Sequence, residues 1–125
     1  MKVSKIFLSN RTKEKANILK EFFKEINVVD WGDLPNFDMI INATTIGLNK
    51  RDKFGIDFSK TDQNKFFYDV IYEPFQTEFS DAGSMEGNII ENGLSMFLFQ
   101  GQQAFNIWHK VEPKINLELI KFLKN

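Results

Sequence analysis

The chain has 125 residues, of which 42% are hydrophobic, so it is long enough for one domain with a buried core and too short for two full ones. Its 16 basic and 17 acidic residues give a net charge of −1, which argues against a general nucleic-acid or membrane-surface binder. It has no cysteine and one histidine, His109, which excludes a disulfide framework and a thiolate or multi-histidine metal site.

The first elements predicted are a strand, a helix and a second strand. Residues 6–8 form a continuous apolar run, as expected of a strand buried on both faces. The polar triplet Asn10, Arg11 and Thr12 follows, and the Thr12 hydroxyl can cap the next helix. The apolar face of that helix is predicted from Leu19, Phe22, Phe23 and Ile26. Residues 28–29 make a short second strand.

Two further strands lie in the middle of the chain. Residues 39–41 form a buried strand that ends in the polar stretch "NATT". The charged segment 49–64 is predicted to be a loop with room for one helical turn. Residues 66–71 form the fourth strand, which Pro74 stops because proline cannot donate to a ladder.

The last third alternates in the same way. Residues 76–87 are predicted to be a weak helix because of Gly83 and Gly87, and residues 89–90 a short fifth strand. The next helix has an apolar face made of Leu94, Phe97, Leu98, Phe105 and Trp108. A final helix is expected at about 116–124.

Strands separated by helices imply crossover connections, and therefore a mostly parallel α/β sheet with flanking helices. Ligands bind such sheets outside the carboxyl ends of the strands. The segments at those ends are "SNRT", "NATTIG", "DVIYEP" and "ENG", and we expect function to reside there.

Each strand-end residue also has a purely structural interpretation. Arg11 fits a solvated first helical turn, Asn42 and Thr44 fit turns and caps, Tyr72 a core ring, Gly93 a turn, and Gln100 and Gln103 solvent-facing positions. The functional interpretation rests on all four segments falling at strand ends in one order.

The series "NRT", "INATTIGL", "DVIYEPFQTEF" and "NGLSMFLFQGQQAFNIW" resembles the nucleotide-binding domain of the shikimate dehydrogenase family, over nearly the whole chain. The related quinate/shikimate dehydrogenases share the pattern. The resemblance implies a Rossmann-like fold, with residues 1–125 forming a partial NADP-binding domain.

In this resemblance, Asn10, Arg11 and Thr12 contact the adenosine ribose and its 2′-phosphate. An arginine meets a phosphate bidentately, whereas an acidic residue accepts a hydrogen bond from a free 2′-hydroxyl, so NADP is expected rather than NAD. Lys15, one turn after Arg11, adds a second cation.

The other implied roles concern the remaining strand ends. Asn42, Ala43 and Thr44 line the cofactor, Val70 packs near the nicotinamide, and Gly93 lets the backbone approach it, while Tyr72 and Gln100 reach the hydroxyls and carboxylate of a shikimate-type acid.

The sequence departs from the family pattern in three places. Ser95 replaces a glycine, and the helix around residues 80–87 is weaker than usual. The third departure is the absence of the glycine-rich turn with its first strand, together with the N-terminal substrate domain that holds the catalytic lysine and aspartate. No catalytic residue is therefore assigned in this chain.

Without the central first strand, either its two neighbours close up into a five-stranded sheet or another chain fills the gap. We therefore expect the isolated chain to lack shikimate dehydrogenase activity, to bind NADP weakly or not at all, and to self-associate or pair with an N-terminal half.

The expected parent enzyme interconverts 3-dehydroshikimate and shikimate by hydride transfer with NADP, on the route to chorismate and aromatic amino acids. The absence of a signal peptide and of a long apolar run predicts a cytoplasmic protein. The alternatives are a non-catalytic nucleotide-binding or regulatory module, an NAD-dependent quinate/shikimate dehydrogenase, and a different Rossmann enzyme. A truncated gene, a gene fragment and a split subunit would look the same in sequence.

Overall fold

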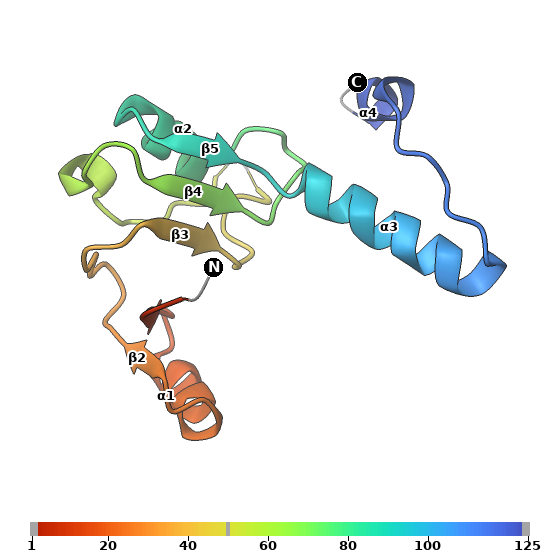
Figure 1. The fold of residues 1–125 in the computed structure, drawn as a ribbon. Helices are drawn as coiled ribbons and strands as arrows, with labels where there is room; N and C mark the ends of the chain where they lie inside the picture. The colour runs from red at the N-terminus through yellow and green to blue at the C-terminus, as the bar shows by residue number, and fades with distance from the viewer. Residues whose placement is uncertain (1–2, 50, 124–125) are drawn as a thin grey trace. The chain divides into compact units, whose positions relative to one another are not determined.

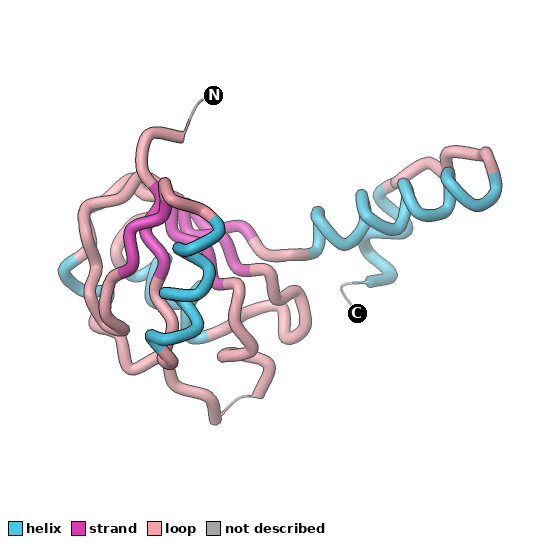
Figure 2. Tube along the Cα trace, turned by 90° about the horizontal axis from the view of Figure 1, so that it is seen from below, coloured by secondary structure: helices cyan, strands magenta, loops and turns pink. Residues whose placement is uncertain are grey.

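The computed structural model describes residues 3–49 and 51–123. The chain divides into two compact units, the first made of residues up to Phe37 together with Gly55–Thr61, and the second made of Asp38–Phe54 and the rest of the chain. Figure 2 shows the short strands joined by long loops. No helix in the described part of the chain is long and apolar enough to cross a membrane.

The first unit contains β1 (Ile6–Leu8), α1 (Lys13–Phe22) and β2 (Ile26–Val28), with the short 3-10 helix η1 (Phe58–Lys60). β1 and β2 pair in parallel with Ile6 opposite Ile26, as the βαβ prediction requires. Helix α1 ends at Phe22, so Ile26 starts β2 instead of extending the helical face, and β2 begins two residues before the predicted 28–29.

The predicted apolar face of α1 is largely uncovered among the described residues. Leu19 is 44% exposed and Phe22 is 75% exposed, whereas Ala16 is the buried residue of the helix. The periodicity therefore predicted the helix correctly, but not the burial of its side chains.

The second unit contains β3 (Met39–Asn42), β4 (Phe66–Asp69), α2 (Glu78–Met85), β5 (Ile89–Glu91), α3 (Leu94–His109) and α4 (Leu117–Leu123). Its sheet has the order β3-β4-β5 and all pairs are parallel, with Asn42 opposite Asp69 at the carboxyl end. Helix α2 packs on β4 and β5, and α3 leads away from the end of β5 (Figure 1).

The mostly parallel α/β fold with flanking helices is confirmed, but the strands form two sheets, of two and three strands. The five-stranded sheet that was one of the two expected outcomes is therefore not present in the described residues.

The core of the second unit lies between its sheet and α2. Phe67 and Phe79 are fully buried, and their ring centroids are 5.2 Å apart. Phe54 reaches the same cluster, with its ring 5.5 Å from that of Phe79. On the opposite face of the sheet Met39 and Ile41 are about half exposed, so one face carries most of the packing.

Helix α2 is better formed than its glycines predicted, for two reasons. Thr77 caps it, accepting from the Ser80 backbone N–H while the Ser80 hydroxyl accepts from the Thr77 N–H in a capping box. Gly83 lets the helix approach the sheet closely, because a Cβ there would lie 2.7 Å from Ile90 Cδ1 and from the Phe67 ring. The glycine costs helix propensity but permits the packing.

Two helical glycines provide a matched test of this packing. Gly83→Ala should destabilise the chain by about 1–3 kcal/mol, because the added methyl overpacks the core. Gly101→Ala in α3 meets no atom within 4 Å and should raise stability by up to about 1 kcal/mol through helix propensity. Urea unfolding followed by circular dichroism measures both, and changes of the same sign would contradict the explanation.

Candidate functional site

The carboxyl end of β1 presents the polar triplet expected there. The Asn10 Oδ1 accepts a hydrogen bond from the Thr12 backbone N–H at 3.1 Å, which forms a tight turn into α1. Thr12 occupies the N-cap position, but its side chain makes no capping hydrogen bond. The predicted hydroxyl cap is therefore not formed, and the helix start is held by the Asn10 turn instead.

Cations gather at this end of the first unit. Arg11 and Lys15 are exposed, and among the described residues neither takes part in an ion pair. Lys13, which the sequence interpretation did not assign, pairs with Asp30 at 2.5 Å between Nζ and Oδ1. The hydrogen bond and the negative charge of Asp30 raise the pKa of Lys13 above its ordinary value. Arg11 and Lys15 thus have side chains available for an anion beside a helix N-terminus.

In the second unit, Asn42 ends β3 with its side chain almost completely buried, at 2% exposure. Its amide nitrogen donates to Asp69 Oδ1 at 2.9 Å and to the Ile46 carbonyl at 3.1 Å. Its amide oxygen accepts from the Thr44 backbone N–H and from the Thr44 hydroxyl. The amide is therefore engaged inside the protein, and it shapes the loop that presents Ala43 and Thr44.

Asp69, at the end of β4, is the centre of this network and was not singled out from the sequence. It is fully buried and accepts from Asn42, from the Ile71 backbone N–H at 3.1 Å and from the Thr77 hydroxyl at 2.5 Å. The signal that could have found it is its position as the first residue of "DVIYEP", since a buried strand rarely ends in an unpaired carboxylate. It ties together the loops after β3 and β4 and the cap of α2.

Val70 and Gly93 lie against each other at the start of α3. The Gly93 N–H donates to the Ile71 carbonyl at 3.2 Å. A Cβ at Gly93 would lie 2.0 Å from the Val70 carbonyl oxygen, so no other residue fits without moving the backbone. This contact alone explains the glycine, and its predicted approach to the nicotinamide stays a prediction.

Tyr72 is positioned by α3. Its ring stacks on that of Phe97, with centroids 4.7 Å apart and an angle of 24° between the planes. Gln100 follows Phe97 by about one helical turn and is exposed. Tyr72 is thus one partner of this aromatic contact, and Gln100 lies about one turn beyond the other partner along α3.

Ser95, where the family pattern has glycine, finds a local partner. Its hydroxyl donates to Glu91 Oε1 at 3.0 Å, which links the first turn of α3 to the end of β5. The substitution is accommodated at the surface.

The described residues contain no cluster of three or more histidine, cysteine, aspartate or glutamate side chains suited to a metal ion. The site residues fall into two groups. Asn10, Arg11, Thr12 and Lys15 belong to the first unit, whereas Asn42, Ala43, Thr44, Val70, Tyr72, Gly93 and Gln100 belong to the second.

Comparison with known proteins gives a consistent set of relatives. No protein-family model matches the chain. A shikimate dehydrogenase (NADP(+)) of Pelagibacter ubique is 48% identical over 98% of this chain and 46% of its own length. One from Caldicellulosiruptor saccharolyticus is 34% identical over 99% of this chain and 47% of its own.

A solved structure agrees with these relatives. The shikimate dehydrogenase of Aquifex aeolicus is 32% identical with a TM-score of 0.77, over 88% of this chain and 41% of that one. The chain therefore spans less than half the length of the relatives that it matches.

The Asp69 network should be measurable as stability. Asp69→Ala leaves three donors without their acceptor, and we expect it to destabilise the chain by about 2–4 kcal/mol. Asp69→Asn keeps one amide oxygen and should cost less. The control is Asp62→Ala, whose side chain is 76% exposed and which should change stability by less than about 0.5 kcal/mol. Equal effects at positions 69 and 62 in urea unfolding would contradict the role of the network.

Proposed function

The chain is homologous to part of the shikimate dehydrogenases, and on that basis we propose that it is a partial nucleotide-binding domain of an NADP-dependent shikimate dehydrogenase. The parent reaction interconverts 3-dehydroshikimate and shikimate. The observation that carries the proposal is the 48% identity to an NADP(+)-dependent relative over nearly the whole chain. A cytoplasmic location and a role in chorismate and aromatic amino acid synthesis belong to the same proposal.

The proposed 2′-phosphate site is the end of β1. Arg11 and Lys15 are exposed cations without ion-pair partners among the described residues, and they flank the start of α1. A guanidinium in this position meets a phosphate with two hydrogen bonds, and the helix N-terminus adds partial positive charge. The Asn10 side chain holds the turn between β1 and α1 that carries Arg11, and the Thr12 hydroxyl is not used to cap the helix. These residues fit a phosphorylated ribose.

The proposed nicotinamide side lies at the ends of β4 and β5. NADPH would supply the hydride and NADP⁺ would accept it in the reverse direction, and the protein would orient the cofactor against the substrate carbon. The loop that presents Ala43 and Thr44 is held by Asn42, and Val70 and Gly93 form the rigid junction into α3. Tyr72 and Gln100 offer a hydroxyl and an amide to a polyhydroxylated acid. The residues that handle the proton belong, in the family, to the substrate domain.

That the isolated chain lacks activity and self-associates, or pairs with an N-terminal half, stays a prediction. For kinetic tests we therefore propose joining the chain to the part of the Pelagibacter ubique relative that it does not cover. Reduction of NADP⁺ in the presence of shikimate, followed by absorbance, would test the function itself. A joined protein that folds, binds NADP⁺ and never turns over shikimate would contradict the proposal.

Arg11 tests the choice of cofactor. In the joined protein, Arg11→Ala should weaken the binding of NADP⁺ by about 10- to 150-fold, because a charge-assisted contact to the phosphate is lost. NAD⁺ lacks that phosphate and should change little. Steady-state kinetics with both cofactors make the comparison, and an equal loss for both would show that Arg11 does not bind the phosphate.

Gln100 tests the substrate side. Gln100→Ala should lower kcat/KM for shikimate by about 5- to 150-fold while KM for NADP⁺ stays nearly unchanged, since an amide partner of the acid is removed. Gln103→Ala on the same helix is the matched control, because Gln103 is also exposed and has no assigned role. Loss of NADP⁺ affinity with normal shikimate kinetics would place Gln100 on the cofactor side instead.

A further inference from the structure

An ion pair between Lys13 and Asp30 lies at the carboxyl end of the first unit's sheet, beside the proposed phosphate site. Lys13 Nζ and Asp30 Oδ1 are 2.5 Å apart, and the two side chains are 51% and 64% exposed. The Ser9 hydroxyl donates to the Asp30 carbonyl at 3.2 Å. Because Ser9 directly precedes Asn10, this hydrogen bond holds Asp30 beside the polar triplet. The pair is therefore tied to the segment that carries Arg11.

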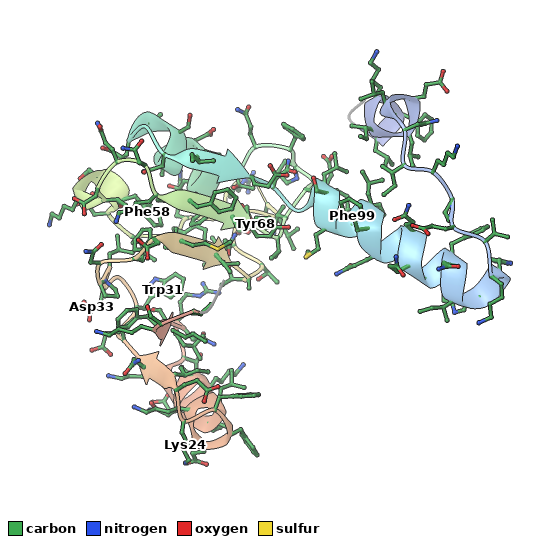
Figure 3. The ribbon with its side chains drawn as sticks, in the orientation of Figure 1. Lys24, Trp31, Asp33, Phe58, Tyr68 and Phe99 are labelled. Carbon is green, nitrogen blue, oxygen red and sulfur yellow. The ribbon has the colours of Figure 1, made fainter. Side chains whose placement is uncertain are left out.

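This end of the unit is more acidic than Arg11 and Lys15 suggest. Besides Asp30, the carboxylates of Asp33 and Glu14 act on Lys13. Trp31 and Asp33 lie on the loop that follows β2 (Figure 3). A ligand that approaches Arg11 thus meets acidic groups as well as cations.

These charges distinguish two kinds of ribose. A carboxylate near the ribose accepts a hydrogen bond from a free 2′-hydroxyl and repels a 2′-phosphate. A lysine paired with that carboxylate cancels the repulsion and leaves the hydroxyl without a free acceptor.

We propose that Lys13 and Asp30 together set the preference of the chain for a 2′-phosphorylated adenosine ligand over one with a free 2′-hydroxyl. This inference rests on the proposed function, and it assigns roles to two residues outside the family motif described above. In it, Asp30 disfavours the phosphate, Lys13 neutralises Asp30, and Arg11 makes the direct contact.

The test uses the 125-residue chain and two small probes, adenosine 2′,5′-bisphosphate and adenosine 5′-monophosphate. The two probes differ only at the 2′ position, and neither needs a pyrophosphate-binding turn. Titration into the ¹⁵N-labelled chain up to millimolar concentrations, followed through the amide resonances of residues 9–16, gives the dissociation constants. The variants are Lys13→Met, Asp30→Asn and the double variant.

At low ionic strength Lys13→Met should lower the affinity for the bisphosphate by about two- to fivefold, and Asp30→Asn should raise that affinity by a similar factor. The double variant should return close to the original affinity. The monophosphate should change less in every case, and added salt should shrink all the differences. Lys24→Met is the matched control, because it removes the same charge two residues beyond the C-terminal end of α1, away from Asp33 (Figure 3), and should leave both affinities unchanged.

The outcomes separate this inference from the proposed function. If the original chain prefers the bisphosphate but the variants keep the same ratio of affinities, the roles of Lys13 and Asp30 are wrong and the NADP proposal stands. If the variants lower the affinities for both probes by the same factor, Lys13 and Asp30 only support the fold. If the original chain binds the two probes with equal affinity, the phosphate site itself is wrong and the inference falls with it.

Discussion

The buried carboxylate of Asp69 is the constraint on which the second unit depends. It accepts hydrogen bonds from the Asn42 amide, the Ile71 backbone and the Thr77 hydroxyl, which come from three separate segments. A buried charge is costly unless its hydrogen bonds are made, so these three segments must keep one relative arrangement. The loops at the carboxyl end of the sheet thereby become rigid parts of the fold, as a ligand site requires.

Close backbone packing completes that arrangement. Gly83 allows α2 to lie on the Phe67 ring, and Gly93 allows the start of α3 to lie on the Val70 carbonyl. The stack of Tyr72 on Phe97 then fixes a side chain at the same junction. In the second unit, the packing of the sheet and the positions of the candidate site residues therefore depend on the same contacts, so a substitution that alters one should also alter the other.

The candidate site residues of the first unit are held differently from those of the second. Its sheet has two short strands, and its site is defined by exposed charges of both signs instead of a buried network. Side chains such as Phe22 in this unit and Ile41 in the second remain substantially exposed. The relatives have more than half of their length outside the region that this chain matches.

The sequence by itself determined the order and type of the elements, because apolar periodicity and turn residues act over a few neighbouring positions. It also placed the candidate residues at strand ends, since parallel strands share one carboxyl edge. Only the tertiary structure decided that Asn42 turns its amide inward, that Asp69 organises the loops, that Gly93 is required by the Val70 carbonyl and that Lys13 pairs with Asp30. It also decided that the strands form two sheets and that α1 leaves Leu19 exposed. These features depend on contacts between residues distant in sequence, and no local pattern encodes which partner a side chain will meet.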